Sequence, residues 1–123
     1  MRRAALLLLV LLAAPLPAAA QTRVPVRVGD HPTHGRIVFD WPSQTAYRLE
    51  EAEGRAVLRF AAPAAFDLSA ARRPPRNVRD IVPEGEVVAI GLAPGARLRH
   101  FRLGNRVVVD VLDGAAPGSA APP

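Results

Sequence analysis

Short segments in which apolar and polar residues alternate recur along this chain, and glycine or proline separates most of them. A period of two is typical of β-strands with one buried face. No stretch keeps a helical spacing of apolar residues over three turns. We therefore predict an all-β domain whose strands cover residues 24–28, 36–41, 45–51, 56–60, 86–92, 97–103 and 106–112. About seven short strands at this spacing favour an antiparallel β-sandwich.

The alternation also predicts which side chains face the core. Ile37, Phe39 and Trp41 share one phase, so we expect Trp41 to be buried rather than free to stack on a sugar. The pair Glu53-Gly54 is a turn signal and predicts a hairpin between the strands on either side. The inward residues of that hairpin are expected to be Tyr47, Leu49, Ala56, Leu58 and Phe60.

Two regions depart from the simple pattern. Leu98 and Phe101 fall on opposite phases of one segment, which predicts a bulge there. Between Ala61 and Gly85 the alternation lapses and proline and arginine accumulate. Within residues 61–85, we read residues 66–69 as a brief strand or a turn.

Both ends of the chain differ from its middle. Residues 1–20 combine two arginines, an apolar run of about 11 residues and a small-residue end, the order of a cleavable signal peptide with a cut between Ala20 and Gln21. The alternative, an uncleaved anchor, needs an apolar run of about 20 residues. Residues 114–123 contain no large apolar side chain and are expected to form a disordered tail or a linker. The domain is thus predicted over residues 21–113, outside the cytoplasm.

The charge of the mature chain is modest. All 16 basic residues are arginine, and Arg2 and Arg3 belong to the predicted leader, so 14 arginines remain against 11 acids, a net charge of +3. That surplus is too small to indicate nucleic acid, which would also be the wrong partner for an exported protein. The chain has no cysteine, so the core has to hold the fold without disulfides.

Two strands repeat one pattern, Arg-apolar-Val-apolar-Asp, at residues 36–40 and 106–110. If they pair antiparallel with Val38 opposite Val108, Arg36 faces Asp110 and Asp40 faces Arg106. Each such cross-strand pair contributes about 0.2–1 kcal/mol. The alternative is that both are ordinary strands with polar outer faces.

These two strands, the signal peptide and a β-rich body of about ninety residues resemble the AMIN domain. The resemblance covers nearly all of residues 23–113, but residues 61–85 match nothing in that family. It implies a periplasmic β-sandwich of the kind found at the front of cell-wall amidases and in pilus secretins, which attaches its protein to the envelope with peptidoglycan as the usual ligand. Such leaders also resemble the first segment of larger tetratricopeptide-repeat proteins.

The candidate ligand-binding residues are Arg72, Arg73, Arg76 and Arg79, which place four guanidinium groups in one proline-stiffened loop. Guanidinium pairs bidentately with carboxylates and phosphates, groups that envelope polymers carry. The alternative is an ordinary solvated loop in an arginine-rich protein.

Signals for catalysis are missing from the sequence. There is no cysteine, no serine in a nucleophile elbow and no glycine-rich phosphate loop, so we expect neither an enzyme nor a cofactor. His31 and His34 share one turn, and a metal site there would need Asp30 and His100 as further ligands. The loop arginines and the resemblance to the AMIN domain together imply a non-catalytic module that binds peptidoglycan or another anionic envelope polymer. The alternative is a protein-interaction domain that docks an envelope protein at a sheet edge.

Overall fold

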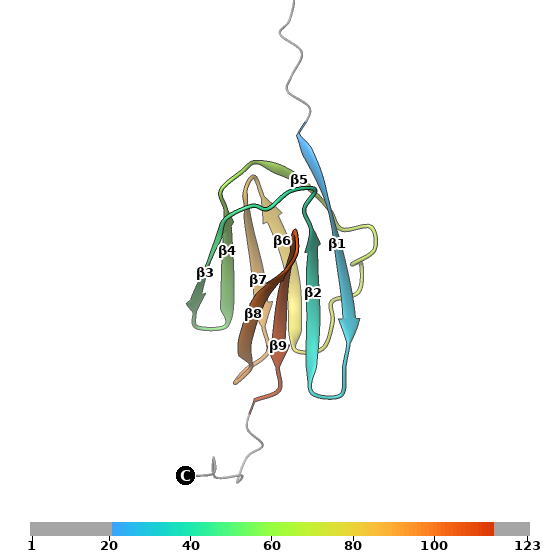
Figure 1. Ribbon diagram of the computed structural model, residues 1–123. Helices are drawn as coiled ribbons and strands as arrows, with labels where there is room; N and C mark the ends of the chain where they lie inside the picture. Colours follow the sequence, from blue (N-terminus) through green and yellow to red (C-terminus); the bar gives the residue numbers. More distant parts are fainter. Residues whose placement is uncertain (1–20, 115–123) are drawn as a thin grey trace, which may run out of the picture.

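The computed structural model of the protein describes residues 21–114, which form nine β-strands in two layers (Figure 1). The strands are β1 (Thr22–Asp30), β2 (His34–Asp40), β3 (Tyr47–Ala52), β4 (Arg55–Phe60), β5 (Ala64–Asp67), β6 (Val78–Glu84), β7 (Val87–Leu92), β8 (Arg97–Leu103) and β9 (Arg106–Leu112). One sheet has the order β5-β1-β2-β9-β8 and the other β3-β4-β7-β6. The predicted all-β sandwich is therefore correct.

The sheets depart from the prediction in number and in direction. Nine strands replace about seven, because the stretch 61–85 contributes β5 and β6. The pair β1–β5 is parallel, whereas the other strand pairs of residues 21–114 are antiparallel. Pro83 lies within β6, where it hid the alternation, but β6 is an edge strand and can accommodate a proline.

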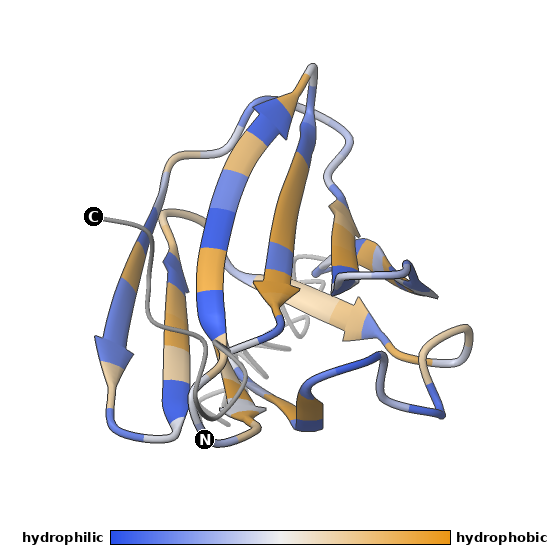
Figure 2. Ribbon diagram, turned by 90° about the horizontal axis from the view of Figure 1, so that it is seen from below, coloured by the Kyte–Doolittle hydropathy of each residue, from blue (hydrophilic) through white to orange (hydrophobic). Residues whose placement is uncertain are grey.

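The core lies between the two sheets and is filled by alternate residues of each strand. Figure 2 shows the corresponding change between hydrophobic and hydrophilic positions along the strands. Ile37 and Phe39 from β2 are fully buried, as is Leu58 from β4. Trp41 is 5% exposed and packs with its ring centroid 5.0 Å from that of Phe60, which confirms its place in the core.

The predicted bulge in residues 97–103 is wrong. β8 pairs with β9 in one unbroken register from Arg97 to Leu103, and the irregularity lies in β6, between Val78 and Asp80. Leu98 packs against the core, whereas Phe101 lies on the outer face of the sheet, so both phases of this strand carry an apolar residue.

The hairpin between β3 and β4 is present with Glu53 and Gly54 at its turn, as predicted. Its inward residues are less uniform than expected, because Tyr47 and Leu49 are only half-buried. Within residues 21–114 no helix is long and apolar enough to cross a membrane. The predicted leader and nearly all of the predicted tail lie outside the described residues.

Candidate functional site

The two Arg/Asp strands lie side by side at the centre of the five-stranded sheet. β2 pairs with β9 in the predicted register: Val38 is opposite Val108, Arg36 opposite Asp110 and Asp40 opposite Arg106. Because directly opposed residues of an antiparallel pair share a face, all four charged side chains lie on the outer surface of this sheet. The outer strands add an arginine to each carboxylate, so both aspartates lie between two guanidinium groups.

Asp110 is the buried member of this arrangement. Its side chain has no exposed surface, and Arg36 donates to it with Nε–Oδ1 and Nη2–Oδ2 distances of 2.7 and 3.0 Å. Arg99 of β8 donates to Oδ2 from its Nη2 at 2.7 Å. Burial alone raises the pKa of Asp110, but the hydrogen bonds from Arg36 and Arg99 and the nearby positive charge outweigh it and hold the pKa below the usual value.

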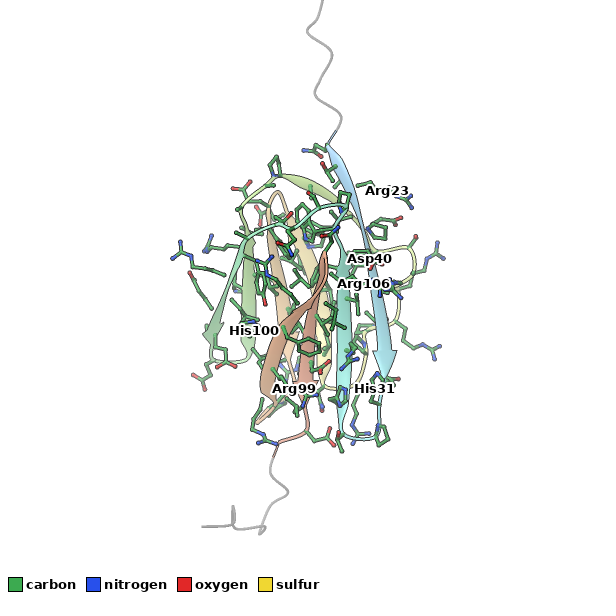
Figure 3. All side chains as sticks on the ribbon, viewed as in Figure 1. Arg23, His31, Asp40, Arg99, His100 and Arg106 are labelled. Carbon is green, nitrogen blue, oxygen red and sulfur yellow. The ribbon has the colours of Figure 1, made fainter. Side chains whose placement is uncertain are left out.

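Asp40 is also held between two arginines, but its side chain is more exposed to solvent than that of Asp110. Arg27 of β1 donates to it at 2.6 Å from Nε and 3.0 Å from Nη2, and Nε of Arg106 lies 3.3 Å from Oδ1. The Asp40 side chain is 26% exposed. The hydrogen bond and the charge of Asp40 raise the pKa of Arg27, so this guanidinium stays fully charged. Figure 3 shows Asp40 beside Arg106 toward one end of the strands and Arg99 toward the other.

An apolar row separates the two charged clusters. Val38, Val108 and Phe101 lie opposite one another on successive strands. The Arg36 guanidinium carbon lies 5.6 Å from the centroid of the Phe101 ring, a cation–π contact. On the outer face of this sheet, guanidinium groups therefore lie on both sides of a narrow hydrophobic strip.

This surface carries the whole charge surplus of residues 21–114. Its outward positions hold six arginines and three aspartates, a net charge of +3: Arg23, Arg27, Arg36, Arg97, Arg99, Arg106, Asp40, Asp67 and Asp110. The other eight arginines of these residues are matched by eight acids. We call the nine-residue set the arginine face.

The four loop arginines predicted as a ligand site do not converge on one point. Arg76 is bound by Asp113, with Nε–Oδ1 and Nη2–Oδ2 distances of 2.7 Å, and its backbone N–H donates to Asp30. Arg73 lines a small hollow beside the end of β1, whereas Arg79 lines a groove on the four-stranded sheet. Arg72 is an exposed loop residue.

The loop also has a structural role. Asn77 adopts a positive φ of 68° and donates from its side chain to the carbonyl of Val111 and to Asp113. The hydrogen bonds from Arg76 and Asn77 lower the pKa of Asp113 to about 2. This loop therefore fastens the end of β9 to the start of β6.

The four-stranded sheet has a shallow groove of about 490 Å³ on its outer face. The groove forms because the central strand β7 presents small residues there, including Ala89 and Gly91, between the longer side chains of β4 and β6. Arginines and acids both line it, so it has little net charge.

The histidines do not assemble a metal site. The His31 and His34 rings stack with centroids 4.5 Å apart, and Nε2 of His34 lies 3.9 Å from Asp110. Nδ1 of His100 is instead 2.8 Å from the Tyr47 hydroxyl, on another part of the sandwich (Figure 3). Among residues 21–114 no group of three or more potential ligands could hold a metal ion. His100 therefore does not join His31 and His34 in one group of ligands.

The sequence identified four of the nine residues of the arginine face. Arg36, Asp40, Arg106 and Asp110 were recognised from their repeated pattern, but Arg27 and Arg99 were not. Their outward phase beside Val26 and Leu98 is readable in the sequence. Which strands flank β2 and β9 is a long-range property that one sequence does not state.

No protein-family model matches the chain, and neither the curated proteins nor the solved structures include a significant match. Its function therefore has to follow from the chemistry of its surfaces.

Proposed function

We propose that this protein is an exported, non-catalytic module that binds an anionic polymer of the bacterial cell envelope, with peptidoglycan as the first candidate. The observation that carries the proposal is the arginine face, which holds the full +3 surplus of residues 21–114 on the outer face of one sheet. The strands that resemble the AMIN domain, β2 and β9, form the centre of this face.

The construction of the face suits a repeating polymer better than a small molecule. Its guanidinium groups are spread over four strands of the sheet, β1, β2, β8 and β9, and do not surround a cavity. The aspartates fix the orientation of several of these groups, so less side-chain entropy is lost when carboxylates bind. Arg23, Arg27 and Arg106 remain at least half exposed and can still donate to a ligand.

The test is co-sedimentation of residues 21–123 with purified peptidoglycan sacculi at about 0.1 M and about 1 M ionic strength, between which the screening length falls from about 10 to about 3 Å. We expect binding at the lower salt and its loss at the higher. The diagnostic variant is R23Q/R97Q/R106Q, which removes the charge surplus and leaves Asp110 with both of its arginines. At about 0.5 kcal/mol for each exposed charge pair, its affinity should fall about tenfold.

The matched control is R48Q/R55Q/R79Q, which removes the same charge from elsewhere on the molecule. If only the net charge matters, both triple variants weaken binding equally, and the arginine face has no special role. Absence of sedimentation at low salt removes the wall-binding proposal. The loop variant R72Q/R73Q/R76Q/R79Q tests the site first expected from the sequence, and we expect it to bind nearly as the parent does.

A further inference from the structure

The sandwich has four edge strands, and three of them are short or interrupted. β5 has only four residues, and β6 contains Pro83 and an irregular register near Val78. β3 has six residues. β8 has seven, pairs with β9 without interruption and contains neither proline nor bulge. Of these edges, β8 therefore offers the longest regular row of backbone groups.

The hairpin turn determines which residues of β8 direct their backbone outward. β8 and β9 are joined by the two residues Gly104 and Asn105, with Gly104 at a φ of 59°. In such a turn the flanking residues, Leu103 and Arg106, form a hydrogen-bonded pair, and the alternation continues along the ladder. Leu98, His100 and Arg102 consequently point their N–H and C=O groups away from β9, toward the free edge.

A hollow lies directly beside this edge. It has a volume of about 300 Å³ and is lined by Leu49 and Glu51 of β3 and by Leu98 and His100 of β8. Leu49 and Leu98 are both half-buried, so the hollow exposes part of the core between the two sheets. A strand added to β8 would direct every second side chain toward this side of the sheet, and the one beside Leu98 and His100 would enter the hollow.

The charge on β8 selects the kind of strand that fits. Arg97, Arg99 and Arg102 are all exposed, and the acid that lines the hollow is Glu51. Arginine at an edge opposes pairing with another basic strand and favours an acidic one. At the hollow itself Glu51 disfavours a second acid, whereas Leu49 and Leu98 favour an apolar side chain.

We propose that the free edge of β8 binds an extended, acidic segment of a partner protein as an additional antiparallel strand. Its acidic side chains would lie beside Arg97 and Arg99, and an apolar side chain would enter the hollow between Leu49 and Leu98. Backbone hydrogen bonds at Leu98, His100 and Arg102 would supply the affinity, and the hollow the specificity. This inference does not rest on the wall-binding proposal, which concerns polymer contacts on the arginine face.

The probe is a blocked peptide in which glutamate and valine alternate, and its control replaces glutamate by lysine. Amide hydrogen exchange of residues 21–123 should slow about tenfold or more at Leu98, His100 and Arg102 when the glutamate peptide is added. The amides of Arg99 and Phe101, already bonded to β9, should change little. The lysine peptide should leave all five unchanged.

A pair of substitutions at His100 distinguishes the contribution of its backbone N–H to peptide binding from that of its side chain. His100→Thr and His100→Pro both remove the imidazole and its contact with Tyr47, but only proline removes the N–H that faces the edge. We expect the threonine variant to bind the peptide and the proline variant to bind about tenfold more weakly. If the proline variant does not fold, the alternating exchange pattern of the parent protein decides the question.

Three results would overturn the inference. They are protection at β3 or β6 instead of β8, equal binding of both peptides, and self-association of the protein through β8 without peptide. Loss of sacculus binding together with retained peptide binding would refute only the wall-binding proposal.

Discussion

Asp110 and Asp40 have nearly the same chemistry in different degrees of burial, which makes them a natural comparison. Each carboxylate is held between two arginines on the outer face of one sheet. The Asp110 side chain is fully buried, whereas Asp40 is 26% exposed. Substituting each by asparagine keeps the shape and removes the charge.

The two substitutions are expected to lower the free energy of unfolding by amounts that differ by about 2 kcal/mol. Hydrogen bonds to buried charged groups contribute about 1.5–3 kcal/mol each, and Asp110→Asn weakens two such arginine interactions while its amide still accepts from one. We therefore expect it to lower the free energy of unfolding by about 3 kcal/mol. Exposed pairs contribute about 0.2–1 kcal/mol, so Asp40→Asn should cost about 1 kcal/mol.

The assay is urea denaturation at neutral pH, followed by the fluorescence of Trp41, the only tryptophan and a core residue. At about 4–8 °C per kcal/mol, the two variants should also differ by roughly 10 °C in Tm. Equal costs, within about 0.5 kcal/mol, would refute the argument that burial determines the contribution of these carboxylates.

Three further outcomes are expected. The folded-state pKa values of Asp67 and Asp113 are lowered to about 2, by hydrogen bonds from Ser69 and Arg23 and from Arg76 and Asn77 respectively. The ionised carboxylates therefore contribute fully to the free energy of unfolding above about pH 4, and this contribution is lost as the pH falls toward 2. A free energy of unfolding that does not change between pH 5 and pH 2 would contradict this. Gly35→Ala would place a methyl group against the backbone of Arg76 and should lower the free energy of unfolding by about 2 kcal/mol or more, measured by thermal unfolding. Gly29→Ala is the control, because its methyl group would meet only the tip of the His31 side chain at 3.8 Å and should be tolerated. Leu58→Ala removes a fully buried side chain and should cost about 2–5 kcal/mol in urea denaturation, and a cost below 1 kcal/mol would show that the core there is loosely packed.

Much of the sandwich could be predicted because its central strands are regular. β9 and β2 alternate cleanly, and the repeated pattern gave their pairing with Val38 opposite Val108. Prediction failed for β6, where an internal proline disguised the strand, and the short β5 only overlaps residues 66–69, predicted as a brief strand or a turn. It also failed for Phe101, because the outer face has an apolar strip of its own and an apolar residue there does not signal a bulge.

The candidate site was harder to predict than the fold for a physical reason. Four neighbouring arginines in the sequence suggested one basic site. In the structure Arg76 is hydrogen-bonded to Asp113, whereas Arg79 lies on the four-stranded sheet. The arginine face is instead assembled from strands far apart in the chain. Charge clustering along a sequence is therefore a poor guide to charge clustering on a β-sandwich, where neighbouring residues alternate between faces.

The directions of β1 and β9 have a mechanical consequence. Both run antiparallel to β2, so they are parallel to each other, and the described chain enters at one pole of the sandwich and leaves at the opposite pole (Figure 1). Tension applied between residues 21 and 114 would load the β1–β2 and β2–β9 ladders along the strands. Hydrogen bonds perpendicular to the pull share such a load and have to break together rather than one after another. This topology is expected to resist stretching when force is applied between the two ends of the described chain.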